Sequence, residues 1–271
     1  MTKKYYITTP IYYVNDKPHI GHAYTTLACD VMARFKRLDG YDVTFLTGTD
    51  EHGQKVEKAA EAADLSPQHF TDQVSQNFRD LTKFMHFSND DFIRTTEDRH
   101  KAACQRIWSI LQDNGNIRLG KYEGWYSVRD ETFFAETELV NGMAPTGAPV
   151  EWVEEPSYFF NLSAWQDKLL TFYDENPRFV GPESRFNEVK SFVKSGLRDL
   201  SVSRASFKWG VPVPGDDNHV MYVWLDALTN YLTAAGWPER EQTGDKEKYT
   251  RVWPANLHMV GKDILRFHAV Y

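Results

Sequence analysis

Apolar residues along this chain alternate between short extended runs and helical stripes. Residues 5–9, Tyr-Tyr-Ile-Thr-Thr, form an aromatic and β-branched run that predicts a buried strand. From Gly21 onward apolar positions recur three and four residues apart, which predicts a helix capped at Gly40. The stripe consists of Tyr24, Leu27, Ala28, Val31, Met32 and Phe35. A second extended run over 42–47 completes a strand–helix–strand unit, which is typical of a parallel, doubly wound α/β sheet.

Three more helices are predicted before residue 116. The first covers 54–63 and is rich in Ala, Glu and Lys. Ser66 and Pro67 open the second as cap and first helical residue. A capping box at Thr95 and Asp98 opens the third, which ends at Asn114-Gly115. These helices are expected to cover the sheet.

The pattern of apolar residues changes between residues 117 and 210. Short aromatic extended pieces alternate with Gly- and Pro-rich loops, which predicts a smaller inserted α+β domain built on an antiparallel sheet. Two helices are predicted within it, one opened by a capping box at Ser163 and running to about Glu175, the other over 183–194. The predicted organisation is therefore a first half of the main α/β domain over 1–116, this insertion over 117–210, and the start of the second half over 211–271.

The last segment is expected to return to the main sheet. Residues 209–215 predict that return, followed by a strand over 220–224, a helix over 226–232 and a strand over 257–260. Gly261-Lys262-Asp263-Ile264 then opens a helix whose apolar stripe is still running at Tyr271. From this unfinished stripe we expect the chain to be the N-terminal piece of a longer protein.

Composition narrows the class of protein. The 271 residues are 41% hydrophobic and 25% charged, and no apolar run approaches the roughly 20 residues of a membrane span. The formal net charge of −7 argues against a surface that grips nucleic acid everywhere. Cys29 and Cys104, far apart in sequence, cannot form a disulfide framework or, alone, a thiolate zinc site. A protein of the reducing cytoplasm, without a membrane partner, is the expectation.

The first candidate functional residues are His19-Ile20-Gly21-His22, which lie at the junction between the first predicted strand and the helix after it. Such a junction presents unpaired backbone N–H groups and the positive end of the helix dipole, which favours phosphate. Two imidazoles there can donate to charge that develops on a phosphoryl group, and Gly21 leaves room for a nucleotide. Taken alone, the tetrad fits a polar helix start equally well. Asp50, at the carboxyl end of a strand, is either a ligand-binding acid or a helix cap.

Four linked motifs give the chain a family resemblance. Residues 10–22, Pro-Ile-Tyr-Tyr-Val-Asn-Asp-Lys-Pro-His-Ile-Gly-His, resemble the first signature of the class I aminoacyl-tRNA synthetases. Gly48-Thr49-Asp50-Glu51-His52-Gly53, Tyr222-Val223-Trp224-Leu225-Asp226-Ala227 and Val260-Gly261-Lys262-Asp263-Ile264 are similar to motifs of the bacterial methionyl-tRNA synthetases. The resemblance covers the whole chain in the same order. It implies a Rossmann-like class I catalytic domain and a connective insertion.

The resemblance also implies a reaction and its residues. Members of the family condense ATP, with Mg²⁺, and methionine to methionyl-adenylate and pass the methionyl group to tRNA. The implied catalytic histidines are His19 and His22. The implied ATP-binding residues are His19, Gly21, His22, Gly261 and Asp263. The implied methionine-binding residues are Ile11, Tyr13, Asp50, Trp224, Ala227, Leu228, Tyr231, Ile264 and His268. Aromatic and aliphatic walls suit a thioether, and Asp50 suits the α-ammonium.

Two departures from the family pattern qualify these expectations. The Lys-Met-Ser-Lys-Ser signature does not occur in these residues, and the anticodon-binding domain would follow them, so we expect a poorly active fragment that meets tRNA mainly through other regions. Many members hold zinc in the insertion through cysteines, but residues 115–155 contain none, with Ser127 and Asp130 where a knuckle would lie. No zinc or other bound metal is therefore expected.

Two other classes of function stay open from the sequence. One is a non-catalytic module that keeps the amino-acid pocket and activates nothing. The other is a different histidine-tetrad nucleotidyl transferase, similar to pantothenate synthetase, which would need neither the motif at 222–227 nor the large insertion.

Overall fold

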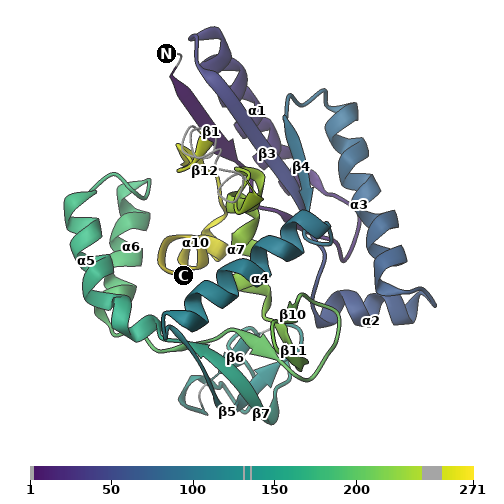
Figure 1. The fold of residues 1–271 in the computed structure, drawn as a ribbon, viewed down its shortest axis with the longest axis vertical. Coiled ribbons are helices and arrows are strands. Elements are labelled where there is room, and N and C mark those ends of the chain that lie inside the picture. The colour runs from purple at the N-terminus through teal and green to yellow at the C-terminus, as the bar shows by residue number, and fades with distance from the viewer. Residues whose placement is uncertain (1–2, 131, 135, 240–251) are drawn as a thin grey trace.

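The computed structural model describes residues 3–130, 132–134, 136–239 and 252–271. Its centre is a five-stranded parallel sheet in the order β12-β1-β3-β2, with β4 also paired to β3 (Figure 1). The strands are β1 (Lys4–Thr8), β2 (Tyr12–Tyr13), β3 (Asp42–Asp50), β4 (Asp91–Arg94) and β12 (Leu257–His258). The predicted parallel α/β sheet is confirmed, while β2 and β4 are strands that the sequence did not predict.

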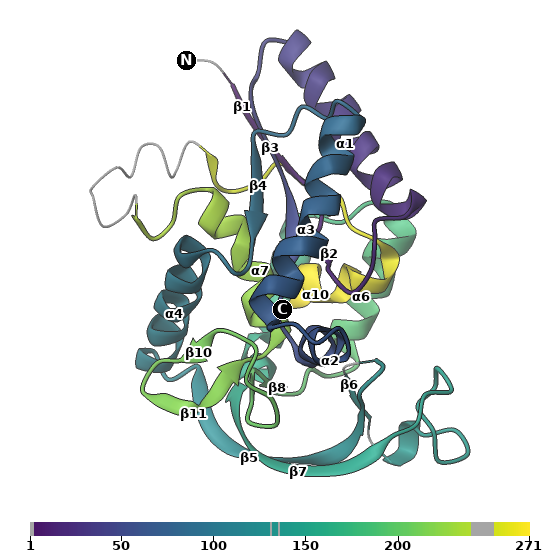
Figure 2. The same cartoon turned by 90° about the vertical axis from the view of Figure 1, so that its right-hand side faces the viewer.

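Alternation along the strands sends side chains to two helical layers. On β1, Ile7 packs with Cys29 and Ala33 of α1 (Ile20–Leu38), whereas Tyr6 packs with Tyr231 of α7 (Val223–Ala234). Successive residues of a strand point to opposite faces of a sheet. Helices α1 and α7 therefore cover opposite faces, as the side view shows (Figure 2).

Helix α1 forms where predicted, but it presents the unexpected face to the sheet. Its buried residues are Thr26, Cys29, Asp30 and Ala33. The largest members of the predicted apolar stripe point outward instead, with Tyr24 74% exposed and Val31 60% exposed. Apolar periodicity thus identified the helix correctly and its buried side wrongly. Small residues lie on the sheet because they let the helix approach it closely.

Three helices follow β3 and β4 in the predicted order. They are α2 (Gln54–Ala62), α3 (Pro67–Phe84) and α4 (Asp98–Asp113). Ser66 caps α3 through its hydroxyl, which accepts a hydrogen bond from the His69 N–H, as expected. The capping box predicted for α4 is wrong, because the cap residue is Glu97 and makes no side-chain cap bond. The Thr95 hydroxyl accepts instead from the Glu51 N–H, 2.9 Å away.

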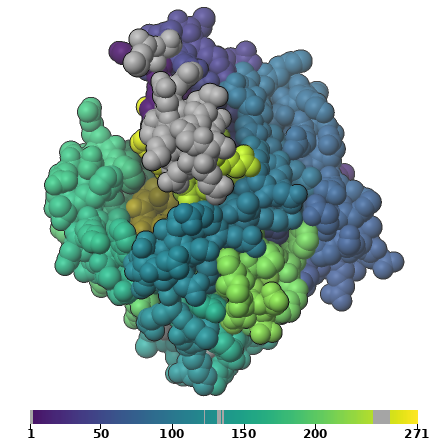
Figure 3. Space-filling model, viewed as in Figure 1, coloured from purple at the N-terminus to yellow at the C-terminus, as the bar shows by residue number. Residues whose placement is uncertain are grey.

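The insertion contains the predicted antiparallel sheet, ordered β6-β5-β7-β8. Its strands are β5 (Ile117–Ser127), β6 (Thr132–Phe134), β7 (Glu151–Phe160) and β8 (Leu200–Ser201). Helices α5 (Gln166–Glu175) and α6 (Glu183–Lys194) pack around the buried Tyr173 and stand as a lobe at the left of the molecule (Figure 3). The capping box predicted at Ser163 is wrong, since its hydroxyl donates to Asp199 and α5 begins three residues later.

The segment after the insertion differs most from the prediction. Strands β9 (Ser203–Arg204), β10 (Pro212–Val213) and β11 (Asp216–Met221) form a separate three-stranded antiparallel sheet rather than returning to the main sheet. The predicted strand over 220–224 is therefore wrong in its second half, because α7 already begins at Val223. After β12, the short helices η3 (Lys262–Ile264) and α10 (Leu265–Val270) complete the described chain. None of the described helices is long and apolar enough to cross a membrane.

Candidate active site

The histidine tetrad forms the first turn of α1. His19 is the N-cap, and its Nδ1 accepts a hydrogen bond from the Gly21 N–H at 3.1 Å. His22 Nδ1 in turn accepts from the His19 N–H at 3.0 Å, which closes a reciprocal capping box. The two rings stack with centroids 3.9 Å apart. A Cβ added at Gly21 would lie 2.9 Å from the His19 ring, so a larger residue there would displace that ring.

Hydrogen bonding fixes the tautomer of both rings. Because Nδ1 of each imidazole accepts a backbone N–H, the proton of the neutral ring resides on Nε2, which is left to donate outward. Burial and the neighbouring His19 lower the pKa of His22 to about 4. His22 is thus a neutral donor at pH 7. With no acidic residue in the first turn, the positive end of the helix dipole is uncompensated, which suits an anion.

Tyr12 connects the tetrad to a pocket. Its ring packs edge-on against His22 at 4.7 Å, and its hydroxyl donates to the His22 carbonyl and shares a bond with Thr26. Burial raises the pKa of Tyr12 to about 12. The residues on either side of it, Ile11 and Tyr13, line the pocket. Sequence reasoning assigned Tyr12 no role, and the alternation along β2 is the signal that separates it from its neighbours.

The pocket has a volume of about 500 Å³, within the usual range for a small-molecule site. It lies at the carboxyl ends of β2 and β3, between α7 and α10, where open α/β sheets bind ligands. The structure brings all nine residues predicted to bind methionine into its lining. They are Ile11, Tyr13, Asp50, Trp224, Ala227, Leu228, Tyr231, Ile264 and His268.

Four charged residues line the pocket, and Asp50 is buried whereas Lys55, Asp130 and Asp263 are more exposed. Asp50 ends β3 and is only 7% exposed. A carboxylate there can accept charge-assisted hydrogen bonds from a cationic group of a ligand. The helix-cap alternative is not what the structure shows, because Gly53 is the N-cap of α2.

Aromatic side chains form the other walls. Trp224 stacks on Phe267 with ring centroids 3.6 Å apart. His268 Nδ1 donates to the Ile264 carbonyl at 2.9 Å, so its Nε2 accepts from the Tyr231 hydroxyl at 2.7 Å. Burial lowers the pKa of His268, which keeps the ring neutral and this pair intact at pH 7. The walls are therefore apolar faces held in place by hydrogen bonds at their edges.

The residues predicted to contact ATP do not all meet in the pocket. Asp263 belongs to its lining. Gly261 is the N-cap of η3 and lies beside Asp263, whose Oδ1 a Cβ at Gly261 would approach to 2.4 Å. His19, Gly21 and His22 lie outside the lining. Tyr12 lies between them and the pocket: its ring contacts His22, and its neighbours Ile11 and Tyr13 line the pocket. Their role stays a prediction.

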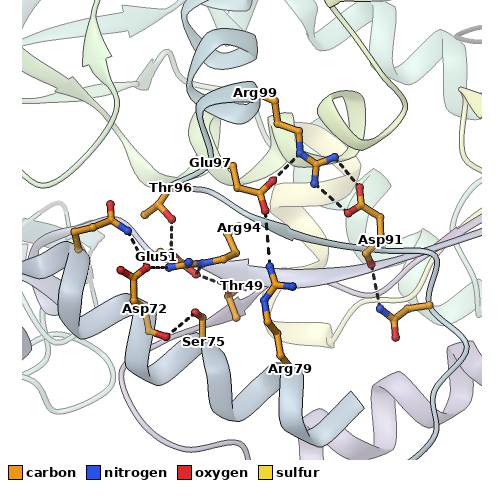
Figure 4. Close-up of polar contacts among 12 residues, drawn as sticks. Thr49, Glu51, Asp72, Ser75, Arg79, Asp91, Arg94, Thr96, Glu97 and Arg99 are labelled. Atoms are coloured by element: carbon orange, nitrogen blue, oxygen red, sulfur yellow. Dashed lines mark hydrogen bonds and ion pairs between the residues drawn. The ribbon is translucent and has the colours of Figure 1, made fainter. Parts of the chain in front are cut away.

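The loop after β3 is held from two sides. Glu51 is fully buried and accepts from Arg94 through both carboxylate oxygens, at 2.7 and 2.8 Å. The hydroxyls of Thr49 and Thr96 also donate to it (Figure 4). The next residue, His52, points to α7. This alternation could not be predicted from the sequence, because Arg94 and Asp226, the partners of Glu51 and His52, lie far along the chain.

A second histidine pair meets at α7. The Asp226 carboxylate lies 2.6 Å from His52 Nδ1 through one oxygen and 2.6 Å from His100 Nε2 through the other. All three side chains are buried. Burial opposes ionisation of Asp226, yet the electrostatic interaction with His52 and the hydrogen bonds from both rings lower its pKa overall. The spacing of His100 and Cys104, four apart on α4, was the available sequence signal for this cluster.

Two places bear on the metal prediction. In the insertion, the turn that begins at Ser127 is closed by hydrogen bonds: Ser127 and Thr146 both donate to Asp130 Oδ2. Elsewhere in the described residues, His100, Cys104 and Asp226 place potential ligand atoms within 4.8 Å of one another. Ligands about 2.0 Å from one tetrahedral ion would lie about 3.3 Å apart. The 2.6 Å contact between His100 and Asp226 is a hydrogen bond instead.

Comparison with known proteins places this site in a family. The family model described as tRNA synthetases class I (M) matches residues 5–149 and 137–271. A methionine–tRNA ligase of Rickettsia conorii is 66% identical over 272 residues, which cover all of this chain and 53% of that protein. One from Mesorhizobium japonicum is 60% identical over 274 residues, covering 99% and 52%. The chain spans about half the length of the curated relatives it matches.

Solved structures agree with the sequence comparison. Methionyl-tRNA synthetase of Mycobacterium tuberculosis in complex with methionyl-adenylate superposes with a TM-score of 0.94 at 55% identity, over all of this chain and 53% of that one. The apo form of that enzyme gives 0.83 at 52% identity, over all of this chain and 52% of the other. The fold and the whole matched length agree, and the chain therefore belongs to the family of class I tRNA synthetases (M).

Proposed function

We propose that the protein carrying this chain is a methionine–tRNA ligase that activates methionine with ATP to methionyl-adenylate and transfers the methionyl group to tRNA. The observation that carries the proposal is the single pocket that gathers all nine predicted methionine-binding residues. A solved relative with a TM-score of 0.94 is described as bound to methionyl-adenylate, which supports the same ligand here.

In the proposed binding mode, charge and shape recognise different ends of the amino acid. Asp50 pairs with the α-ammonium, which every amino acid shares. Tyr13, Trp224 and Tyr231 surround the side chain, where a thioether gains sulfur–aromatic contacts and fits without branching. His268 acts on the ligand through Tyr231, whose hydroxyl it fixes. Selectivity for methionine then rests on the aromatic walls.

The chemical step places the phosphates of ATP at the start of α1. The methionine carboxylate attacks the α-phosphorus, the bond to the bridging oxygen breaks, and pyrophosphate leaves with that electron pair. His19 and His22 offer outward Nε2–H donors beside a helix N-terminus, where negative charge builds up during displacement. Gly261 and Asp263 are assigned to the adenosine. Mg²⁺ accompanies the ATP phosphates as part of the co-substrate.

The cellular setting follows from the same proposal. tRNA is the acceptor of the methionyl group. We place the protein in the cytoplasm, where a tRNA ligase finds its partners. The two free thiols, Cys29 and Cys104, are both buried, which accords with a reducing compartment.

Amino-acid-dependent ATP–pyrophosphate exchange by the full-length protein that carries this chain tests the proposal. Methionine is expected to support exchange best. Norleucine, which replaces sulfur with CH₂, is expected to compete measurably, because one such group is worth only about 1–3 kcal/mol. Leucine and isoleucine are expected to be rejected by the walls. Methionine binding without any exchange would favour the non-catalytic module, and exchange driven by another acid would favour a different nucleotidyl transferase.

A further inference from the structure

Helix α7 has two faces with different chemistry. One face carries Trp224, Leu228 and Tyr231 and forms a wall of the amino-acid pocket. The opposite face is polar although it is also buried, with every member at most 4% exposed. These residues are Asp226, Thr229, Asn230 and Thr233. The position of the pocket wall therefore depends on what this polar face contacts.

The main contact of the polar face is the Asp226 carboxylate. It is 0% exposed, and its two oxygens lie 2.6 Å from His52 Nδ1 and His100 Nε2 respectively. Each short bond is to a ring that is itself buried, so water does not take part in satisfying the carboxylate. Losing either ring would leave part of a buried charge unsatisfied, which is strongly unfavourable. The Asp226 carboxylate thus joins α7 to α4 and to the segment that follows β3.

The elements joined in this way include both sides of the pocket. His52 is two residues beyond Asp50, the pocket carboxylate at the end of β3. Between them, Glu51 holds the same loop to β4 through Arg94 (Figure 4). His100 belongs to α4, which packs along α7. The Asp226 cluster is thus the polar link between the segment that carries Asp50 and the apolar wall that α7 contributes to the pocket.

We propose that Asp226 is a positioning residue for the amino-acid pocket. Through His52 it sets the separation between Asp50 and the pocket face of α7, and through His100 it holds both against α4. The inference rests on the proposed function, because an α-ammonium and a thioether side chain must be received at a fixed spacing. Displacements of about 1 Å are enough to weaken a well-oriented site. Apolar side chains could fill the same volume without loss of stability. What the cluster adds is therefore a fixed position of α7 relative to Asp50.

Asp30 supplies a matched control. It is another buried helical aspartate, 4% exposed, and its carboxylate accepts hydrogen bonds from Ser88 and Arg34. It lies on α1, on the opposite face of the sheet from α7. Asp226→Asn and Asp30→Asn each remove one buried charge and keep the shape. Only the first is expected to disturb the pocket.

The experiment measures two quantities in the full chain. Calorimetry gives the dissociation constants of methionine and of ATP, and hydrogen exchange gives the protection of the α7 amides. Asp226→Asn is expected to raise the methionine dissociation constant about tenfold, to leave that of ATP within about twofold, and to speed exchange in α7. Asp30→Asn is expected to lower the melting temperature while leaving both the methionine constant and α7 protection unchanged.

A second pair of variants covers the case in which Asp226→Asn does not fold. His100→Gln places an amide N–H where Nε2 stood, whereas His100→Leu offers no donor. The glutamine variant is expected to keep methionine affinity near normal and the leucine variant to lose about tenfold. Equal affinities in the two variants, or an Asp226→Asn effect no larger than that of Asp30→Asn, would overturn the positioning role. If the unsubstituted chain bound no methionine, the proposed function would fail; looser α7 amides in Asp226→Asn but not in Asp30→Asn would then still show that Asp226 holds α7 in place.

Discussion

Two pairs of histidines in this chain occupy opposite environments. The outer pair, His19 and His22, lies at the start of α1, and its Nδ1 atoms accept backbone N–H groups, which leaves the proton of each neutral ring on Nε2. The inner pair, His52 and His100, is buried and brackets Asp226 with both bonds at 2.6 Å. Under the proposed function the outer pair donates to the phosphates of ATP, whereas the inner pair bonds to the protein's own carboxylate. We therefore assign the outer pair to the chemical step and the inner pair to the positioning of the pocket wall.

The difference also shows why one pair is visible in a sequence. The outer pair is compressed into four residues at a strand–helix junction. The members of the inner pair lie 174 and 126 positions away from Asp226. Local motifs can reveal groups that act outward from one turn. Groups that meet across the core become visible only once the fold brings them together.

The largest expected effect is at the outer pair. His22→Ala removes an outward donor and is expected to slow adenylate formation about 10²–10³-fold with little change in methionine affinity. His22→Asn keeps an acceptor for the His19 N–H and lacks the outward donor. It is expected to lose the same rate but to retain the cap, which is worth about 1 kcal/mol of stability. Pre-steady-state adenylate formation and thermal unfolding measure the two effects. Normal rates in both variants would return the tetrad to a purely structural role.

The next effect concerns Asp50, the pocket carboxylate that lies two residues before His52 of the inner pair. Asp50→Asn removes the partner of the α-ammonium, and a hydrogen bond to a charged group is worth about 1.5–3 kcal/mol. Methionine binding is expected to weaken about 10- to 100-fold. Because every amino acid presents the same ammonium, norleucine should weaken equally. Calorimetry with both ligands makes the comparison. A loss confined to methionine would move Asp50 away from the ammonium.

The apolar wall should respond in discrimination rather than in overall affinity. Trp224→Ala enlarges the pocket beside Phe267, so branched side chains gain room. The preference for methionine over leucine is expected to fall about tenfold, in line with the 1–3 kcal/mol that an apolar pocket assigns to one methylene. Exchange assays with each amino acid give the ratio. An unchanged ratio would mean that Trp224 does not form the wall.

The smallest effect is on pH dependence. Because burial and His19 lower the pKa of His22 to about 4, the folded protein binds fewer protons than the unfolded chain between about pH 4 and 6.5. The stability that His22 contributes is therefore present above pH 6.5 and is lost as the pH falls toward 4. The acid limb of the exchange rate assigned to His22 is expected near pH 4. An acid limb near pH 6.5 that disappeared in His22→Asn would contradict the lowered pKa of His22.

The main sheet could be predicted because its signals are local. The runs at β1 and β3 and the intervening helical stripe defined a parallel unit without further information. The buried side of α1 could not be predicted in the same way. Tyr24 and Val31 point outward, whereas Asp30 points inward because Ser88 and Arg34 satisfy its carboxylate. One partner, Arg34, lies one turn away on α1, but the other, Ser88, is 58 residues away and could not be predicted from the helical pattern.

The site divides along the same line. Its pocket residues were assigned through a family resemblance, and the structure gathers them in one lining. The strand predicted over 220–224 was wrong because an apolar run before a helix resembles a strand, and Trp224 sits on α7. His52, His100 and Tyr12 were missed, since their roles arise from contacts across elements. Spacing within α4 can pair His100 with Cys104, but it does not show that Asp226 of α7 lies between His52 and His100.

One side-by-side measurement tests the separation of roles most directly. His22→Ala and His100→Leu are compared in the full-length protein that carries this chain, for methionine affinity by calorimetry and for the rate of adenylate formation at saturating methionine. The account predicts a crossed result: His22→Ala loses about 10²–10³-fold in rate and keeps its affinity, while His100→Leu loses about tenfold in affinity and keeps its rate. If both variants lost the same quantity, the two histidine pairs would not serve separate roles and the account would be contradicted.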